Sequence, residues 1–502
     1  MPHVPEGGST APDHAVPLLR GQRASRPLHV AMVGQKGLPA TYGGVEHHVE
    51  EVGRRLVERG HRVTVYCREG YGGLCDDRTT HLGMELVTTP AIRSKHLDAI
   101  THSATSTASA LRAGVDVVHL HALGPGLLSP LVRLSRGARV VQTVHGLDHE
   151  RAKWGGLAQR VLGLGHEISG RVPDELVVVS RALQEHYARR FGRRAVLIPN
   201  GAPPAADVGS GAPPEVPTGD GPERCGAVGE LVHELLGPQP PRYLLFVGRL
   251  VPEKRPDLLL RAFRAVPGDV RLVVVGDSSF SDEYTASLVR QAAEDPRVVM
   301  TGYQYGDVLQ ALHARALAFV QPSALEGMPL TVLEALSAGA RVVASDIAPH
   351  VELLGRAPSR HALVPVDDEA ALAAAMRRVL AQEGREGDGG AATDPVRARV
   401  LREHCWERST DLLEQVYLDV VARRSGAVRR PPAAGAPSPA RRDPRARRRG
   451  GSPSPALRPA APAALPPSGG RPTPSRPEPS RPTPVRAAPA RPAAGRTPAA
   501  RP

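Results

Sequence analysis

The stretch of the chain that most suggests chemistry is PSALEGMPLTVLEALSAG, residues 322–339. It contains Glu326 in a Gly/Pro-rich turn and Glu334 eight positions later. Pro329 suits the first position of a helix running to Gly339, because its fixed φ and missing N–H cost nothing there. Free N–H groups at a helix start bind anions, whereas carboxylates can bind hydroxyl groups. A nucleotide-sugar offers both, in its diphosphate and in its sugar and ribose hydroxyls.

A structural interpretation of this segment stays open, with Glu326 capping the helix and Glu334 solvated. Two cations favour the ligand interpretation. In FVGRLVPEKRPDLLLRAF, Arg249 follows a predicted strand and Lys254 precedes a predicted helix. Two positive charges held there would neutralise a departing diphosphate. Either cation alone would more simply be a solvated surface charge, so the prediction depends on their combination with the glutamate segment.

A pair of histidines in VDVVHLH is a weaker signal. His119 and His121 are two residues apart and therefore share one face of a predicted strand. A metal site needs more ligands than we find around this pair. We therefore expect no metal and no resident cofactor. We assign His121 to the region that binds the acceptor, the second substrate that would receive a sugar from the nucleotide-sugar.

These residues require a scaffold of parallel strands. Short apolar runs that end in glycine or polar residues are typical of strands buried on both faces. The first half of the chain has such runs at 28–34, 62–68, 115–121, 138–146, 174–180 and 195–201. Between the first two, apolar residues recur at helical spacing over 43–61, which predicts a βαβ unit.

A second series of predicted strands occupies 243–250, 271–277, 297–303, 317–323 and 341–346. We therefore predict an α/β fold with two doubly wound Rossmann-like domains that face each other across a cleft. Ligands of such sheets bind at the carboxyl ends of the strands. The predicted parts are a disordered leader (1–26), an N-terminal acceptor domain (27–202), a linker or insertion rich in Pro, Gly and Ala (203–240), a C-terminal donor domain (241–400), a crossing helix (401–424) and a disordered tail (425–502).

The two motifs GRLVPEKRPDLLLRAF and EGMPLTVLE together make the chain resemble glycosyltransferase family 4, retaining enzymes of the GT-B fold. The resemblance covers roughly residues 28–424. It implies that Arg249 and Lys254 bind the donor diphosphate, that Glu326 contacts the transferred sugar and that Glu334 holds the ribose. It also implies donor contacts from Gly327, Met328, Pro329 and Leu330.

Two N-terminal segments extend this resemblance. GQKGLPATYGGVEHHVEEV is similar to the family's glycine loop, which implies that Gly43 and Gly44 let the backbone approach the donor phosphate or the acceptor. QTVHGLDHERAKW is similar to a segment of bacterial rhamnosyltransferase-like members. There His145 matches the histidine near the reacting sugar, and Asp148 is assigned to the acceptor region.

The reaction implied by the resemblance transfers a sugar from a nucleoside diphosphate to an acceptor hydroxyl with retention of configuration. In a front-side displacement, the leaving diphosphate takes the acceptor's proton while Arg249 and Lys254 hold it, and Glu326 positions the sugar. The segment HCWERSTDLLEQVYLDV resembles the family's terminal helix, which crosses back to the N-terminal domain.

The expected acceptor is a glycan or a lipid-linked glycan in envelope polysaccharide or glycolipid synthesis. A small soluble acceptor such as inositol phosphate is the alternative. A non-catalytic scaffold is less consistent with four intact site residues, namely Arg249, Lys254, Glu326 and Glu334. A nucleotide-sugar-modifying Rossmann enzyme would need G-x-G-x-x-G and a Tyr-x-x-x-Lys pair, neither of which occurs in a suitable context.

Charge is distributed very unevenly along the chain. The net charge is +13, but residues 425–502 alone contribute +14, so the remainder is near neutral and a nucleic-acid partner is not expected. The tail is either a biased extension without function or a weak binder of anionic lipid headgroups or anionic polymers. Four scattered cysteines without C-x-x-C indicate reduced thiols. We expect a cytoplasmic enzyme that is able to dock on the inner membrane face through its tail and the basic surface of its N-terminal domain.

Overall fold

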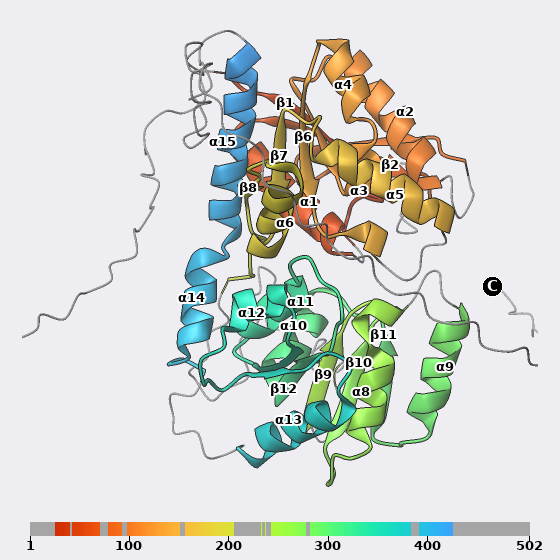
Figure 1. The fold of residues 1–502 in the computed structure, drawn as a ribbon, viewed down its shortest axis with the longest axis vertical. Helices are drawn as coiled ribbons and strands as arrows, with labels where there is room; N and C mark the ends of the chain where they lie inside the picture. The colour runs from red at the N-terminus through yellow and green to blue at the C-terminus, as the bar shows by residue number, and fades with distance from the viewer. Residues whose placement is uncertain are drawn as a thin grey trace, which may run out of the picture. The chain divides into compact units, whose positions relative to one another are not determined.

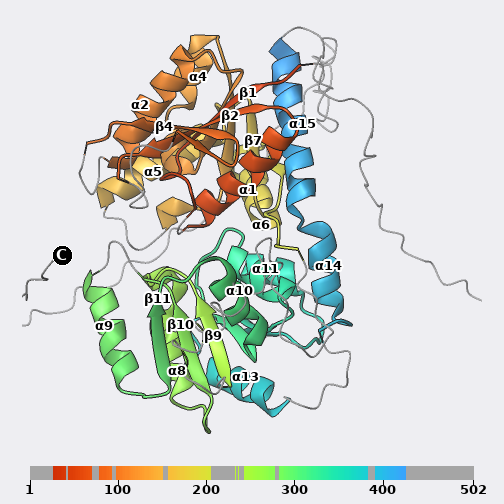
Figure 2. The same cartoon turned by 180° about the vertical axis from the view of Figure 1, so that it is seen from behind.

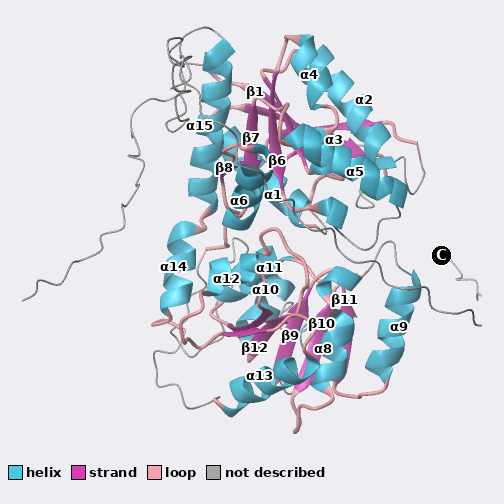
Figure 3. Cartoon of the chain, viewed as in Figure 1, coloured by secondary structure: helices cyan, strands magenta, loops and turns pink. Residues whose placement is uncertain are grey.

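The structure is a computed structural model that describes residues 26–40, 43–70, 79–92, 98–150, 156–204, 232, 236, 242–277, 282–382 and 391–424. The predicted tail lies outside these ranges, as do nearly all of the leader and most of the linker. Within them, two sheets of parallel strands form the framework, which confirms the predicted fold class (Figure 1, Figure 3).

The first sheet has the strand order β3-β4-β2-β1-β5-β6-β7-β8. Its strands are β1 (His29–Val33), β2 (Arg62–Arg68), β3 (Thr80–His81), β4 (Met84–Thr89), β5 (Val117–His121), β6 (Arg139–Val144), β7 (Glu175–Val178) and β8 (Val196–Leu197). All neighbours are parallel except β3 and β4, an antiparallel edge that the sequence analysis did not predict.

Helices cover both faces of this sheet. One face carries α2 (Asp98–Arg112), α3 (Leu123–Gly126), α4 (Ser129–Ser135) and α5 (Gly156–Ser169), and the other carries α1 (Gly44–Glu58) and α15 (Trp406–Arg424). The remaining helix, α6 (Arg181–Phe191), packs on β7 and β8. Burial on both faces explains why the strands are nearly continuous apolar runs.

The second sheet has the order β11-β10-β9-β12-β13-β14 and is entirely parallel. Its strands are β9 (Tyr243–Val247), β10 (Arg271–Val275), β11 (Val298–Gly302), β12 (Ala318–Gln321), β13 (Arg341–Ser345) and β14 (Ala362–Val364). One face is covered by α8 (Pro256–Phe263), α9 (Asp282–Ala293) and α13 (Glu369–Ala381), and the other by α10 (Gly306–Arg315), α11 (Leu330–Ser337), α12 (Ala348–Leu354) and α14 (Pro395–Glu403).

Strand β9 shows how this sequence fills two cores at once. Leu244 and Phe246 belong to the cluster beneath α8 and α13, whereas Leu245 and Val247 belong to the cluster on the opposite face. The alternation follows from the two-residue period of side chains along a strand. The second cluster also includes Val144 of the first sheet, so one apolar cluster contains side chains from both sheets.

Several predicted bounds are corrected by the structure. Pro329 is the N-cap of α11 rather than its first helical residue, and the helix ends at Ser337 instead of Gly339. The predicted helix at 401–424 is two helices, because α14 ends at Glu403 and α15 begins at Trp406. Within the predicted linker, Val232 and Leu236 are helical and buried in the apolar cluster that spans both sheets.

Helix α15 is attached to the first sheet although it follows the second in sequence, and it lies beside α1 (Figure 2). Arg59, the C-cap of α1, donates to Glu414 of α15 at 2.7 Å. In the sheet beneath, His119 Nδ1 and the Tyr417 hydroxyl are 2.6 Å apart and hydrogen-bonded. These contacts hold the C-terminal helix α15 against the first half of the chain.

The strand order explains why the motifs lie where they do. In the first sheet β1 has β2 on one side and β5 on the other, and in the second sheet β9 lies between β10 and β12. At such reversals the loops that follow neighbouring strands diverge and leave room for a ligand. Lys36, His145, Arg249 and Glu326 follow β1, β6, β9 and β12 respectively.

No helix among the described residues has the length and apolar character needed to cross a membrane.

Candidate functional site

A buried ion pair joins the two motifs of the second sheet. Lys254, at the end of the 3-10 turn Pro252–Lys254 after β9, donates from Nζ to Glu326 Oε1 at 2.7 Å. Gln321, the last residue of β12, donates to the same oxygen at 2.9 Å. The side chains of Lys254 and Glu326 are only 15% and 10% exposed. The sequence analysis had expected both residues at one ligand but not their direct contact.

This pair determines the protonation state of Glu326. Burial by itself raises the pKa of the carboxyl group, but the nearby Lys254 charge and its hydrogen bond outweigh burial and lower the pKa to about 2. Glu326 is therefore an ionised acceptor of hydrogen bonds at neutral pH. That state suits binding of sugar hydroxyls and does not suit a general acid.

Helix α11 begins directly after this turn and presents its N-terminus beside the pair. The amides of Val332 and Leu333 bond to the carbonyl of Pro329, so the amides that precede them belong to the first turn, which has no internal acceptors. Among the described side chains, the Thr331 hydroxyl is one of the buried groups without a hydrogen-bond partner. Amides and hydroxyl together form a site with the polarity that a phosphate requires.

The second glutamate, Glu334, lies one turn further along α11. Burial raises the pKa of Glu334, while the charges of His47 and Lys254 act in the opposite direction. Its Oε2 is 3.7 Å from the buried His313 Nε2. Sequence reasoning missed His313, because its position in α10 gives no local signal.

Glycines bring the first half of the chain to α11. A Cβ added to Gly327 would overlap the carbonyl oxygen of His145, so the loops after β12 and β6 touch through their backbones. A Cβ on Gly44 would lie 3.3 Å from Leu330. Gly43 has φ of 109°, a conformation that favours glycine. The structure thus brings Gly43, Gly44, His145 and the start of α11 together.

Lys36 is a cation that sequence reasoning quoted without singling it out. It follows β1, and its backbone N–H donates to Glu46 at 2.8 Å. Burial lowers the pKa of Lys36, and the charges of Arg68 and Arg249 lower it further, while that of Glu46 raises it. Arg249 of the second half is therefore close enough to Lys36 of the first half for the two positive charges to interact. The sequence did hold a signal for Lys36, because it follows the first predicted strand of a doubly wound sheet, where ligands bind.

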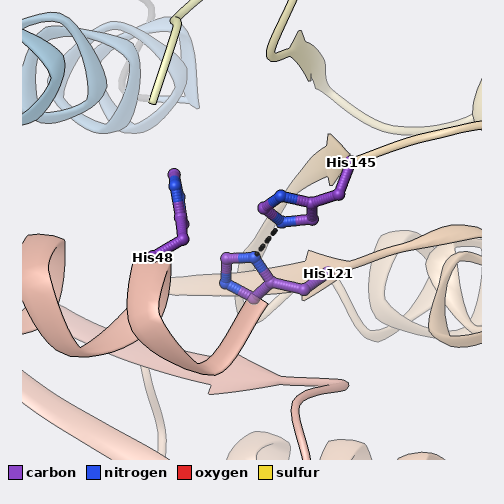
Figure 4. Close-up of side chains that lie close together, drawn as sticks. All are labelled: His48, His121 and His145. Carbon is purple, nitrogen blue, oxygen red and sulfur yellow. Dashed lines mark hydrogen bonds between the residues drawn. The ribbon is translucent and has the colours of Figure 1, made fainter. Parts of the chain in front are cut away.

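Three histidines of the first half converge beside the His145 loop: His48 of α1, His121 of β5 and His145 itself (Figure 4). His121 Nδ1 and His145 Nε2 are 3.1 Å apart and hydrogen-bonded. His48 Nδ1 is 2.9 Å from Asn200 Oδ1, and Asn200 Nδ2 donates to the carbonyl of Met328 at 3.4 Å. Asn200 therefore joins the predicted Met328 to His48 of the first half, and the sequence analysis predicted neither Asn200 nor His48.

The remaining predicted residues occupy less central positions. Asp148 begins the 3-10 turn Asp148–Glu150 and is half-buried. His119 is buried with both ring nitrogens engaged, one by Tyr417 and one by Thr143 at 2.7 Å. Residues 151–154 of the predicted rhamnosyltransferase-like segment lie outside the described part of the chain.

Two family models match the chain, one in each half. The model described as Glycosyltransferase Family 4 matches residues 42–205, and the model described as Glycosyl transferases group 1 matches residues 241–382. The second contains Arg249, Lys254, Glu326 and Glu334.

Curated relatives agree with these models. A D-inositol 3-phosphate glycosyltransferase of Acidothermus cellulolyticus is 28% identical over 84% of this chain and 98% of its own length. A GDP-mannose-dependent alpha-mannosyltransferase of Mycolicibacterium smegmatis is 36% identical over 36% of this chain and 44% of its own length. Among solved structures, sucrose-phosphate synthase from Thermosynechococcus elongatus superimposes with a TM-score of 0.63 and 22% identity, covering 79% of this chain and all of that one. This likeness shows the shared fold.

Replacing Gly327 with alanine tests the backbone contact with His145. Because the new Cβ has no room against that carbonyl, we expect Gly327→Ala to separate the two loops and to lower both the denaturant midpoint and donor affinity. Gly163→Ala in α5 is the matched control, since its Cβ would meet open space and Ala gains about 0.5–1 kcal/mol over Gly within a helix. Equal midpoints and donor affinities for Gly327→Ala and the wild type would contradict the contact.

The Glu326 pair predicts a pH-dependent part of stability. The folded-state pKa of Glu326, about 2, is below the ordinary glutamate value of 4.5, so the pair's contribution to stability is complete above pH 4.5 and disappears as pH falls toward 2. This shift corresponds to roughly 3 kcal/mol at neutral pH. We therefore expect Glu326→Gln to lower the urea midpoint more at pH 6 than at pH 3. A difference that is independent of pH would contradict an ionised Glu326.

Proposed function

Because the chain belongs to glycosyltransferase family 4 and is a nucleotide-sugar-dependent glycosyltransferase, we propose that it transfers a hexose with retention of configuration to a hydroxyl of an envelope glycan or glycolipid. The observation that carries the donor half of this proposal is the Lys254–Glu326 pair at the start of α11. It sets a cation, an ionised carboxylate and a helix N-terminus side by side, which matches the diphosphate and the sugar hydroxyls of one donor.

In this proposal the diphosphate binds at the first turn of α11, with Arg249 and Lys254 as its cations. An ammonium group has three N–H donors, so Lys254 can hold Glu326 and a phosphate oxygen together. The backbones of Gly327, Met328, Pro329 and Leu330 line this position, with Gly44 opposite Leu330. Glu334 receives the ribose hydroxyls from its place deeper in α11.

The proposed chemistry breaks the bond between the anomeric carbon and the diphosphate oxygen and forms a bond from that carbon to the acceptor oxygen. The acceptor's proton passes to the departing diphosphate on the same face. Negative charge grows on the diphosphate as the bond breaks, and Arg249, Lys254 and the α11 amides stabilise it there. Glu326 orients the sugar, and no step requires a metal.

For the acceptor side we propose the region beside His121, His145 and Asp148. The name of one relative, a D-inositol 3-phosphate glycosyltransferase, supports a small phosphorylated acceptor, whereas the name of the GDP-mannose-dependent mannosyltransferase specifies a donor and no acceptor. The envelope acceptor is the first choice here, because the arginine-rich tail would bring the enzyme to anionic lipid. A small phosphorylated acceptor is the second, and Lys36 supplies a cation for it.

A donor screen tests the donor site. The full-length chain is incubated with dTDP-, UDP- and GDP-sugars, and release of nucleoside diphosphate is followed. We expect one donor to be used and Lys254→Met to lower kcat/KM by about 10²–10³, the effect of removing one group that stabilises developing charge. Glu326→Gln should also lower kcat.

The matched control is Arg62→Met. Arg62 forms a bidentate ion pair with Glu85 at 2.8 and 3.0 Å, but it is 60% exposed and lies at the amino end of β2, away from the loops of the site. We expect its activity to equal that of the wild type. Undiminished turnover by Lys254→Met, at equal folded content, would refute the proposed diphosphate site.

The tail gives a separate prediction. Residues 425–502 carry a net charge of +14, and each basic residue near an anionic surface contributes about 1 kcal/mol. We expect the full chain to sediment with phosphatidylserine vesicles at low salt and to be released by raised salt, whereas the chain truncated after Arg424 stays in solution. Equal sedimentation of the two forms would exclude the tail as the membrane contact.

A further inference from the structure

The ring of His313 in α10 is a buried polar group that the fold leaves unsatisfied. Its side chain is 3% exposed, and within the described part of the chain neither ring nitrogen has a hydrogen-bond partner. Buried polar atoms are nearly always hydrogen-bonded, so an imidazole with two unpaired nitrogens requires an explanation. Packing against Phe319, with ring centroids 5.4 Å apart, does not provide one, because an apolar side chain would serve there.

The carboxylate of Glu334 in the neighbouring helix α11 faces this ring. Its Oε2 is 3.7 Å from His313 Nε2, just beyond the length of a hydrogen bond. The Glu334 side chain is 22% exposed, and no described residue donates a hydrogen bond to its carboxylate. A buried donor and a largely buried acceptor, both unsatisfied, therefore lie opposite each other between α10 and α11.

The protonation states of the two groups are complementary. Burial lowers the pKa of His313 to about 3, so the ring is neutral at pH 7 and carries one N–H. The carboxylate oxygen on the Nε2 side assigns that hydrogen to Nε2. Burial raises the pKa of Glu334, while the charges of His47 and Lys254 lower it. A hydrogen bond donated by His313 would join the groups that favour the ionised carboxylate.

We propose that His313 is a positioning residue of the donor site, which holds Glu334 Oε2 through its Nε2–H and leaves Oε1 to receive the ribose hydroxyls. This inference rests on the proposed function, in which Glu334 binds the ribose. Closing the gap from 3.7 Å to about 2.9 Å, the usual length of an N–H···O bond, needs only a small rotation of the Glu334 side chain. A carboxylate has about four acceptor positions, so the imidazole does not displace the nucleotide.

Holding one carboxylate oxygen has a specific consequence for binding. A glutamate side chain has several rotatable bonds, and ordering it on binding costs conformational entropy. His313 orders the Glu334 carboxylate before the nucleotide arrives, which lowers that cost. The effect of His313 should therefore appear in the affinity that the ribose hydroxyls contribute, and not in the affinity contributed by the diphosphate or the base.

The test compares a nucleoside diphosphate with its analogue that lacks the ribose 3′-hydroxyl. The probe is whichever of UDP, GDP and dTDP binds the full-length chain most tightly, and both ligands are titrated by calorimetry. We expect the wild type to prefer the complete nucleotide by about 10-fold or more, the effect of a hydrogen bond to a charged group. His313→Leu should reduce this preference to about 3-fold or less and leave the affinity for the analogue unchanged.

Two amide variants separate the donated hydrogen bond from the bulk of the ring. His313→Gln places an amide N–H near the position of Nε2, whereas the shorter side chain of His313→Asn reaches only the position of Nδ1. We expect His313→Gln to keep the preference for the complete nucleotide and His313→Asn to lose it. A role confined to packing would not distinguish the two amides in this way.

The matched control is Ser337→Ala in the same helix as Glu334. Ser337 is buried and donates to the carbonyl of Pro203 at 2.9 Å, so its loss weakens the packing of α11 without removing a contact of the Glu334 carboxylate. The preference for the complete nucleotide should equal that of the wild type.

Two results would overturn the role of His313 while the ribose assignment of Glu334 stands. One is a wild-type preference in folded His313→Leu, and the other is an equal preference in His313→Gln and His313→Asn. A wild type that binds both nucleotides equally would instead refute the ribose assignment, and the role of His313 with it. Circular dichroism checks that each variant is folded, and the two amide variants decide the matter if His313→Leu does not fold.

Discussion

The backbone contact between Gly327 and the His145 carbonyl is the constraint on which the site depends. It joins the loop after β12 to the loop after β6, so residues that follow strands of two separate sheets lie side by side. Asn200 strengthens the junction, because it bonds both His48 and the carbonyl of Met328. A side chain at position 327 would move α11 away from the histidines. A glycine at position 327 is therefore required for the two loops that carry the proposed donor and acceptor groups to touch.

Burial acts on the charged groups of the site in two opposite ways. Glu326 and Lys254 are both largely withdrawn from solvent, yet their mutual attraction keeps the carboxyl group ionised. His48 and His121 are equally withdrawn but have no such partner, so burial leaves them neutral. The same protein interior thus keeps one buried group charged and leaves two others neutral. Whether a buried group is charged therefore depends on whether an opposite charge lies beside it, and not on burial alone.

The return of α15 to the first sheet links the two halves of the chain a second time. The Tyr417 hydroxyl of α15 is hydrogen-bonded to His119 of β5, and Glu414 of α15 accepts a hydrogen bond from Arg59 at the end of α1. These contacts place the chain's last described helix against its first. Their effect on the site is indirect, because His119 lies next to His121 in the strand and its fixed ring limits where His121 can turn.

The sequence by itself determined the two series of parallel strands, the family, and the segments that we propose for the donor site, because these depend on local periodicity and on motifs of contiguous residues. It did not predict the short edge strands β3 and β14, whose few residues carry little pattern, or the break at residues 404–405 that separates α14 from α15. Nor did it predict the contact of Lys254 with Glu326, the role of Asn200, or the meeting of His48 with His121 and His145. Those pairings join residues tens to hundreds of positions apart. The strand order within each sheet brings most of them within bonding distance, and the contact between the two halves does so for Asn200 and Met328.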